Sequence, residues 1–374
     1  EGGHLDGLDS PVVVHQSWAM RVPTDVLRSL VSDIFRRAGC SLEEAERIAV
    51  HLLAADLAGH PSHGVVRVRG YVDLLAAGAV VADREVEVVS DNGTLVVLDG
   101  GYGFGQTVGE QAVAIGLERV ERAGVSVVAL RHSGHLGRIA DWAEASTDAG
   151  YVSIHFVNVT GKGLVAPFGG RERRFGTNPV AIGIPQLARP PILIDFATSV
   201  VAEGKARVAL NGGKPVPADA LVGPDGRPTG DTSVLYGEVS EQRGPDPRRG
   251  GGALRTMGDQ KGSALALACE ILAGVLTGSG VSGDEPFCNG MLSIYLAPDH
   301  FGAEGFLAQA TEFADHVRGA APSAEAGPDG VQVPGDIERG LADEQQAEGV
   351  DLAEGTWSDL ARTAAKVGAE LPRV

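Results

Sequence analysis

Short apolar runs alternate with segments of helical spacing between residues 86 and 298, and this alternation limits the possible folds more than any other feature. The apolar runs, rich in Val, Ile and Leu as buried strands are, lie at 125–131, 151–158, 179–185, 191–196 and 291–298. The helical segments between them are 107–123, 138–148, 199–210 and 260–277. Residues 86–99 add two β-like runs around the turn sequence Asp91-Asn92-Gly93. We therefore expect an α/β body over residues 86–298.

Helical patterns occupy both ends of the chain. Residues 24–58 read as two helices, the second opened by a capping box of Ser41 and Glu44. Gly59-His60-Pro61 breaks that helix, and a third helix is expected from about Gly64 to Gly78. Residues 302–318 and the tail are also helical in pattern. We predict a helical domain that combines residues 20–85 with a C-terminal return over 299–374.

The charge of the chain excludes several classes of partner. Lys and Arg total 31 against 49 acidic residues, a formal charge of −18 over 374 residues, and no Lys/Arg-rich block breaks the excess. Such a chain repels nucleic acid and anionic membranes. An anionic small substrate must therefore be held by a few cations. The candidates are Arg67, Arg138, Lys205 and Lys261.

Several absences favour a cytoplasmic protein. No apolar run is long enough to span a bilayer, and residues 1–18 lack the basic and apolar regions of a secretory signal. Cys40, Cys269 and Cys288 are widely spaced, which favours reduced, buried thiols over disulfides or a zinc knuckle.

Two glycine motifs are similar to a dinucleotide-binding loop but lack its context. Gly161–Ala166 reads GxGxxA after a strand, and Pro167 follows it where a helix should open. Gly278–Gly283 reads GxGxxG but comes after a helix. With 53 glycines, chance matches are expected. Both motifs are interpreted as turns, so a dinucleotide would not bind through the Rossmann loop.

Two HxxH pairs, His60/His63 and His132/His135, leave metal binding open as a minority interpretation. Pro61 keeps the first pair off a regular helix face, and no acidic residue completes a familiar ligand triad. The alternative is that these histidines bond to backbone in turns. A metal hydrolase would be the functional consequence of the metal interpretation.

Ser62-His63-Gly64 suggests acid–base chemistry. An exposed imidazole at a helix break has a pKa near neutrality and can exchange a proton. Arg67 lies one helical turn further on, where its guanidinium could bind a substrate carboxylate. The alternative is a capped helix start with a solvated arginine. The residues alone leave both interpretations open.

Three further stretches carry candidates with equally simple structural alternatives. Asp195 ends an apolar strand, where α/β proteins place ligands, but could equally cap a helix. The segment 175–179, which contains Thr177 and Asn178, suits close approach to a ligand or a plain turn. Lys261 opens a helix where phosphate could bind, or it is simply solvated.

Together, five ordered blocks resemble the NAD(P)-dependent malate/L-lactate dehydrogenase family, which lacks a Rossmann fold and includes sulfolactate, ureidoglycolate, diketogulonate and Δ1-piperideine-2-carboxylate dehydrogenases or reductases. The blocks are 62–67, 131–146, 166–185, 194–205 and 259–280. The resemblance covers about residues 24–370. It implies a mixed-sheet NAD(P)-binding body beside a helical domain. It also implies a homodimer with the active site near the subunit interface, and NADH or NADPH as cofactor.

The resemblance also implies roles for individual residues. His63 corresponds to the general acid/base, with Ser62 beside it, and Arg67 to the clamp on the substrate carboxylate. Asp195 corresponds to a carboxylate that steadies the histidine or the cofactor. The remaining residues, expected near the nicotinamide, the substrate or the cofactor's anions, are His135, Asn158, Thr177, Asn178, Lys205 and Lys261. No metal is expected.

The implied reaction is hydride transfer between nicotinamide and a small 2-oxo or 2-hydroxy carboxylic acid. Gly134 and Leu136 replace the family's usual Asn and Phe around His135. Residues 253–262 and 216–226 also depart from the family pattern. Two alternatives therefore stay open. One is a cyclic ketimine reductase, and the other is a repurposed cofactor-binding member without dehydrogenase turnover.

Overall fold

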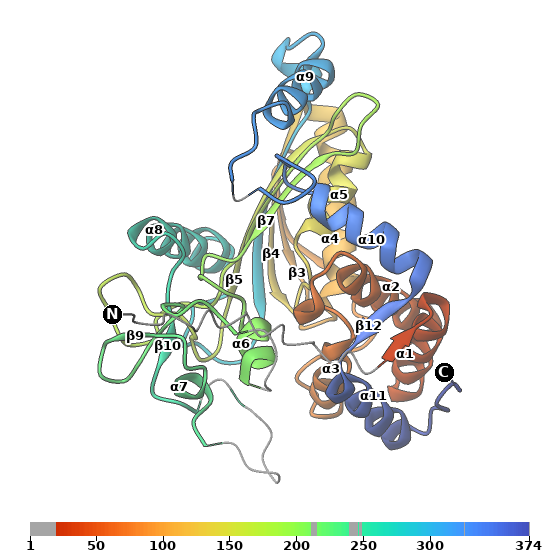
Figure 1. Ribbon diagram of the computed structural model, residues 1–374. Coiled ribbons are helices and arrows are strands. Elements are labelled where there is room, and N and C mark those ends of the chain that lie inside the picture. The colour runs from red at the N-terminus through yellow and green to blue at the C-terminus, as the bar shows by residue number, and fades with distance from the viewer. Residues whose placement is uncertain (1–19, 211–214, 239–245, 247–248, 325, 374) are drawn as a thin grey trace, which may run out of the picture.

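A mixed seven-stranded sheet forms the centre of the computed structural model, which describes residues 20–210, 215–238, 246, 249–324 and 326–373 (Figure 1). Its spatial order is β2 (Glu87–Asp91), β3 (Leu95–Asp99), β4 (Val125–Ser133), β11 (Asn289–Leu296), β5 (Val152–Val159), β6 (Val180–Ile184) and β7 (Ile192–Phe196). β3 and β4 are parallel, and every other neighbouring pair is antiparallel. The predicted mixed-sheet α/β fold is therefore confirmed. The N-terminal segment 1–18 lies outside the described residues.

Helices cover both faces of this sheet. α4 (Gly105–Ala123) and α5 (Ala140–Asp148) bury Leu98, Leu130, Trp142 and Tyr295 against one face. α8 (Gln260–Cys269) and the π-helix η3 (Glu270–Val275) lie on the other side (Figure 1). The approach is close, because a Cβ at Gly290 of β11 would lie 2.0 Å from the Ala273 carbonyl oxygen.

The chain ends meet in a separate helical layer. α1 (Thr24–Ala38), α2 (Leu42–Leu57) and α3 (Val68–Ala76) share one apolar core with α11 (Glu354–Val367). β1 (Met20–Val22) pairs antiparallel with β12 (Val350–Leu352), which ties the two ends together. This contact between the chain ends was expected from the sequence. The boundaries at 85/86 and 298/299 stay a prediction.

The capping box at α2 is only half formed. Ser41 Oγ accepts a hydrogen bond from the Glu44 backbone N–H at 3.1 Å, as predicted. The Glu44 carboxylate does not return to Ser41. It accepts instead from the backbone N–H of Asp83 at 2.7 Å and from the Thr107 hydroxyl at 2.8 Å. Tertiary partners therefore replace the local reciprocal bond.

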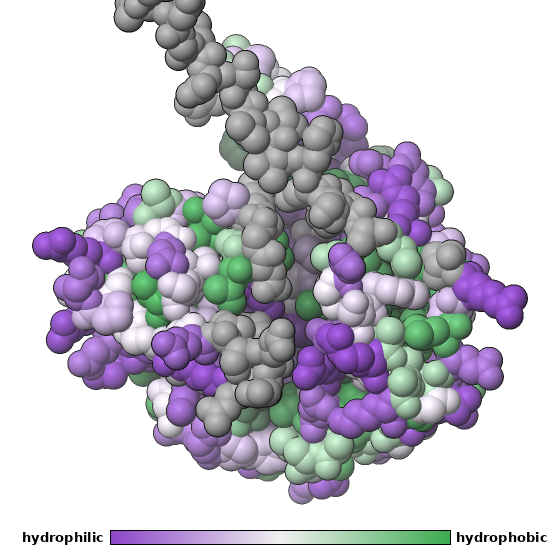
Figure 2. Space-filling model, turned by 60° about the horizontal axis from the view of Figure 1, so that its bottom comes forward, coloured by the Kyte–Doolittle hydropathy of each residue, from purple (hydrophilic) through white to green (hydrophobic). Residues whose placement is uncertain are grey.

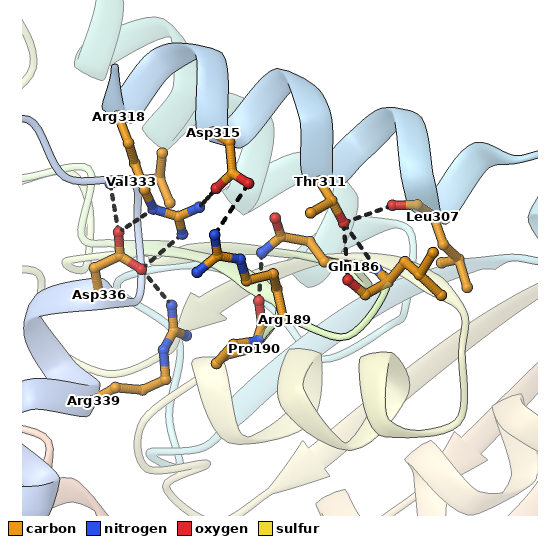
Figure 3. A network of polar contacts seen from close by, with 11 residues as sticks. Gln186, Arg189, Pro190, Leu307, Thr311, Asp315, Arg318, Val333, Asp336 and Arg339 are labelled. Carbon is orange, nitrogen blue, oxygen red and sulfur yellow. Dashed lines mark hydrogen bonds and ion pairs between the residues drawn. The ribbon is translucent and has the colours of Figure 1, made fainter. Parts of the chain in front are cut away.

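α9 (Phe306–Arg318) does not join the helical layer, unlike the rest of the C-terminal return. It lies at the far end of the sheet (Figure 1). There the Thr311 hydroxyl accepts from the Leu187 backbone N–H at 2.9 Å. α10 (Asp336–Glu348) then runs back along α2. Its first residue, Asp336, receives bonds from Arg318 and Arg339 (Figure 3).

A smaller unit packs beside the sheet. It contains α6 (Glu203–Leu210), α7 (Ser233–Tyr236) and a three-stranded sheet of β10 (Ala253–Leu254), β8 (Leu221–Val222) and β9 (Pro228–Thr229). The 3-10 helix η4 (Pro298–Phe301) does not belong to this unit, because it connects β11 to α9. The two glycine motifs lie in turns, where Gly161 pairs with Ser282 and neither motif opens a helix. No helix of the described residues is long and apolar enough to cross a bilayer. Hydrophilic residues are spread over the face shown in Figure 2, with smaller hydrophobic patches between them.

Candidate active site

Two short 3-10 turns connect α2 to α3 and carry three of the predicted site residues. η1 (Pro61–His63) presents Ser62 and His63, and η2 (Val65–Arg67) presents Arg67. The third helix was expected to begin near Gly64 but begins at Val68, because Gly64 has an extended backbone and interrupts the winding. His63 and Arg67 are therefore separated by a bend.

The imidazole rings of His63 and His135 stack, with centroids 5.5 Å apart and planes within 8° of parallel. His63 Nδ1 lies 3.0 Å from Ser62 Oγ, and His135 Nδ1 lies 2.6 Å from the hydroxyl of Tyr71. Neither Nε2 atom has a hydrogen bond within the described part of the chain. The structure thus presents two parallel rings, each held through Nδ1, with Nε2 available to a ligand.

Tight backbone packing places His135. It follows β4 in a loop where Gly134 N–H donates to the Gly103 carbonyl at 2.8 Å. A Cβ at Gly134 would lie 2.6 Å from that carbonyl oxygen, and one at Gly105 would lie 2.2 Å from the His135 carbonyl oxygen. The backbone at 103–105 approaches the loop at 134–135 so closely that only glycine fits at position 134.

Burial and a nearby positive charge favour the neutral form of both imidazoles. Burial, followed by the charge of Arg67, lowers the pKa of His63 to about 3. Burial, again followed by Arg67, lowers the pKa of His135 well below its ordinary value. The expectation of a near-neutral pKa for His63 is therefore wrong for the free protein, since an imidazolium here would be desolvated beside a guanidinium.

Arg67 lies between the imidazole pair and α6. Its Nε donates to the Ser62 carbonyl oxygen at 2.6 Å, and a terminal nitrogen lies 3.9 Å from the Glu203 carboxylate. Gly204 brings α6 close, because a Cβ there would lie 2.3 Å from Ser62 Cβ. The Glu203 carboxylate also accepts from the Tyr236 hydroxyl at 2.9 Å. The Arg67 side chain is 31% exposed, and its Nε is fixed by the bond to Ser62.

Asp195, on β7, lies beside the start of α5 and not in the turns that carry His63 and Arg67. Its carboxylate accepts from the backbone N–H of Ala140, the first residue of α5, at 2.9 Å. Burial raises its pKa, while that bond and the charges of His60 and Arg138 oppose the rise. No hydrogen bond among the described residues joins Asp195 to His63. Asp195 therefore does not cap the helix that follows it in sequence, but bonds from β7 to the start of α5. A role toward histidine or cofactor stays a prediction.

The predicted cofactor-lining asparagines gather around a carboxylate that sequence reasoning missed. Glu270, at the start of the π-helix, accepts from the side-chain amides of Asn178 at 2.8 Å and Asn158 at 3.3 Å, and from the Ser282 hydroxyl at 2.5 Å. Asn178 Oδ1 is buried without a partner. The Thr177 carbonyl oxygen accepts from Thr198. These residues therefore bond within the α/β body, and no hydrogen bond among the described residues joins them to the imidazole pair.

The two lysines are exposed. Lys205 lies on α6 two residues after Glu203, and Lys261 lies in the first turn of α8. Neither ammonium group makes a hydrogen bond or ion pair with another described residue. Their proposed contacts with cofactor or substrate anions stay predictions.

The four histidines of the HxxH pairs have four different partners. His63 contacts Ser62 and His135 contacts Tyr71, whereas His132 Nδ1 lies 3.0 Å from Asp99 Oδ2. His60 Nε2 is 3.7 Å from a carboxylate oxygen of Glu338 on α10. No group of three or more His, Cys, Asp or Glu side chains in the described ranges could hold a metal ion.

Tyr71 and Glu203 are the nearest members of the site that sequence reasoning did not identify. Tyr71 falls within the third expected helix, and only its hydroxyl signals the polar contact that such side chains make when buried. Glu203 follows an apolar strand and lies in a short charged helix, with no local feature that points to Arg67. Both contacts depend on tertiary packing.

The described part of the chain is thus a mixed-sheet α/β protein in which two stacked imidazoles lie close to a partly exposed arginine. The chain belongs to the malate/L-lactate dehydrogenase family, whose model matches residues 22–361. The family recognised from the sequence is confirmed, and the protein is an oxidoreductase of small hydroxy acids.

Individual relatives agree. The chain is 38% identical over 355 residues to hydroxycarboxylate dehydrogenase B of Escherichia coli (strain K12), covering 93% of this chain and 94% of the relative. It is 33% identical over 311 residues to a Δ1-pyrroline-2-carboxylate/Δ1-piperideine-2-carboxylate reductase of Pseudomonas putida, covering 81% and 87%. A solved E. coli structure described as a malate/lactate dehydrogenase superposes with a TM-score of 0.85 at 36% identity, covering 94% and 96%.

Proposed function

We propose that this protein is an NAD(P)H-dependent oxidoreductase that transfers a hydride between nicotinamide and a small 2-oxo or 2-hydroxy carboxylic acid. His63 is the general acid/base and Arg67 binds the substrate carboxylate. The observation that carries the proposal is the stacked pair of His63 and His135 beside the partly exposed Arg67. His63 would exchange a proton with the substrate, His135 would offer a flat ring to the cofactor, and Arg67 would bind the carboxylate.

The residues present fit a nicotinamide cofactor, either NADH or NADPH. The His135 ring is flat, neutral and fixed by Tyr71, so it suits contact with an uncharged reduced nicotinamide. When bound, the nicotinamide supplies or accepts the hydride. Asn158, Thr177, Asn178, Asp195, Lys205 and Lys261 are proposed to shape or neutralise the surroundings of the cofactor.

The charges of the site give His63 a substrate-dependent proton affinity. The Arg67 guanidinium is one cause of the low pKa of His63. A substrate carboxylate on Arg67 neutralises that charge, so binding raises the pKa of His63 toward the range in which it can donate a proton. In reduction, His63 Nε2 would donate to the carbonyl oxygen. In oxidation, the neutral Nε2 would accept the hydroxyl proton.

A cyclic ketimine carboxylate is the second candidate substrate. The similarity to the pyrroline/piperideine-carboxylate reductase favours it, and the same Arg67 contact would bind its carboxylate. Oxidation of NADH and NADPH should be followed with a panel of 2-oxo acids, each with and without an amine, and with preformed cyclic imines. Turnover that requires amine or imine would replace the hydroxy-acid assignment. Cofactor binding without turnover across the panel would identify a member without dehydrogenase activity.

A homodimer in the cytoplasm is part of the proposal. Four large apolar side chains on the outer side of α8 and η3 are 49–64% exposed, which suits a covered surface. They are Leu267, Ile271, Val275 and Leu276. The three cysteines are buried and unpaired, as suits a reducing compartment. Light scattering of the purified protein would measure the oligomeric state, and a monomer would contradict this part.

The direct test of the proposed function compares the wild type with His63→Ala in the 2-oxo acid assay. A crystal soaked with NADH or NADPH and a poor substrate should show nicotinamide beside His135 and a carboxylate on Arg67. A cofactor bound away from both histidines would disprove the assignment.

A further inference from the structure

A buried carboxylate lies directly under the turn that carries His63 and Arg67. Asp56, in the last turn of α2, is 5% exposed. Its Oδ2 accepts a hydrogen bond from the backbone N–H of Val65 at 2.8 Å. Val65 opens the second 3-10 turn, so this bond satisfies a donor that the turn itself leaves without a partner.

The same carboxylate explains the glycine at position 64. A Cβ there would lie 1.9 Å from Asp56 Oδ1 and 2.1 Å from its Cγ, far inside contact distance. The φ of Gly64 is −86°, so the backbone conformation does not demand glycine. The space is taken by Asp56. The peptide between the acid/base residue and η2 therefore rests on this carboxylate.

We propose that Asp56 is a positioning residue for the reaction, and that its carboxylate sets the relative direction of His63 and Arg67. The inference rests on the proposed function of those two residues. The Val65 bond fixes where one 3-10 turn ends and the next begins. The backbone N–H of Arg67 donates to the Gly64 carbonyl at 3.0 Å. The direction of the Arg67 side chain therefore depends on the position of the Gly64 peptide.

Further contacts hold the turn that contains Asp56. Its backbone carbonyl accepts from the Gln345 side-chain amide at 3.1 Å and from Gly59 N–H at 2.9 Å. Leu341 of α10 packs against the same turn, since a Cβ at Gly59 would lie 2.7 Å from its Cδ1. Because α10 and Gly59 fix the backbone of Asp56, its carboxylate can fix the position of the Val65 peptide.

Steady-state kinetics of Asp56→Ala and Asp56→Asn test the proposal. Removing the acceptor lets the turn shift, and misplacement by about 1 Å costs on the order of 100-fold in catalysis. Asp56→Ala should therefore lower kcat/KM by about 10- to 100-fold, with both a lower kcat and a higher KM for the acid. Asp56→Asn keeps an oxygen for Val65 N–H and should stay within about threefold of the wild type. Asp25→Ala, an exposed aspartate of α1, is the matched control.

A merely structural Asp56 gives a different result. Asp56→Ala would then lower the melting temperature but leave kcat/KM unchanged in the folded fraction, and this outcome would overturn the proposal. So would an Asp56→Asn variant as impaired as Asp56→Ala, because the oxygen acceptor would not matter.

Gly64→Ala provides a second test that does not depend on Asp56→Ala folding. The added Cβ must displace either the carboxylate or the peptide, so kcat/KM should fall by tenfold or more. The same change made in Asp56→Ala should cost less, because the nearest atoms are gone, whereas independent effects would multiply. The proposal would be contradicted if Gly64→Ala had the kcat/KM of the wild type. It would also be contradicted if the fold-losses in kcat/KM of the two single variants multiplied in the double variant.

His63→Ala in the same assay separates the two proposals. If His63→Ala retains turnover, the acid/base assignment is wrong whatever Asp56 does. If His63→Ala loses turnover while Asp56→Ala and Gly64→Ala behave like the wild type, only the positioning role is wrong.

Discussion

His63 and His135 stack face to face at 5.5 Å although 71 residues of chain separate them. One ring comes from the turn between α2 and α3, in the helical layer, and the other from the loop after β4, in the sheet. The pair therefore forms where the two parts of the molecule meet. A ligand that binds beside both rings would contact both layers at once.

Removing the imidazole of His63 should abolish most of the turnover. General acid–base groups contribute typically about 10²- to 10⁴-fold, so we expect His63→Ala to lower kcat by about two orders of magnitude or more. His132→Ala is the matched control, since that imidazole belongs to the other HxxH pair and bonds to Asp99. Steady-state assays of both variants would check this. Equal activity of the two variants would remove His63 from the mechanism.

Changing the shape of the Arg67 cation should weaken substrate binding. Lysine keeps the charge but loses the two-pronged contact with a carboxylate. We expect Arg67→Lys to raise the KM of the 2-oxo acid by about tenfold, with a smaller change in kcat. Arg69→Lys, two residues further on and paired with Asp359 at the surface, should change neither. An Arg67→Lys variant with wild-type KM would show that another group binds the carboxylate.

The hydroxyl of Tyr71 should matter through His135. Burial raises the pKa of Tyr71 to about 12, so the hydroxyl stays protonated, and Gln106 donates to its oxygen. The tyrosine proton is then directed at His135 Nδ1, which places the imidazole proton on Nε2. Tyr71→Phe releases this ring and should raise the KM of NAD(P)H several-fold. Tyr102 stacks on His132, so Tyr102→Phe is the control and should leave this KM unchanged.

Local signals predicted the elements of this fold well, and tertiary contacts explain the rest. The turn at 91–93, the bond from Glu44 N–H to Ser41 and the helical stripes depend on neighbours in sequence, and these predictions are confirmed. The contacts of Arg67 with Glu203 and of Asp56 with Val65 depend on how α2 and α6 pack against the turn. No spacing rule encodes them.

Besides tertiary contacts, the burial of individual side chains could not be predicted from the sequence. The sequence showed an imidazole next to a serine and a glycine, which predicts exposure and a near-neutral pKa. The packed turn lowers the pKa of His63 instead. The π-helix at Glu270 was likewise hidden in an apolar helical pattern, and its carboxylate bonds to residues about 90 or more positions away.

The pH dependence of oxidation should reveal the coupling of Arg67 to His63. The neutral imidazole is the base, so activity falls as the pH drops through the pKa of His63. In the free enzyme that pKa is lowered, so kcat/KM should hold down to acidic pH. With a carboxylate on Arg67 the pKa rises, so kcat should fall at a higher pH than kcat/KM. Profiles from pH 4 to 9 test this, and a reversed order of the two pKa values would contradict the coupling.

Asp336 should stabilise the fold by anchoring α10 to α9. Arg318 contacts its carboxylate through two nitrogens at 2.9 Å each, and Arg339 adds a third bond at 2.7 Å (Figure 3). These bonds lower the pKa of Asp336 to about 2. A carboxyl with a lowered pKa in the folded state stabilises the protein above its unfolded pKa and loses this effect as the pH falls through the folded pKa. Asp336→Ala should therefore reduce the free energy of unfolding by about 1 kcal/mol at pH 7.

The difference between wild type and Asp336→Ala should shrink as the pH falls below about 4 toward 2, because protonation then removes the carboxylate from the wild type as well. Urea unfolding of both proteins across this range measures it. Asp343→Ala is the control, since Asp343 is exposed on the same helix and makes no ion pair with another described residue. A difference that is constant with pH would mean that Asp336 acts through packing and not through its charge.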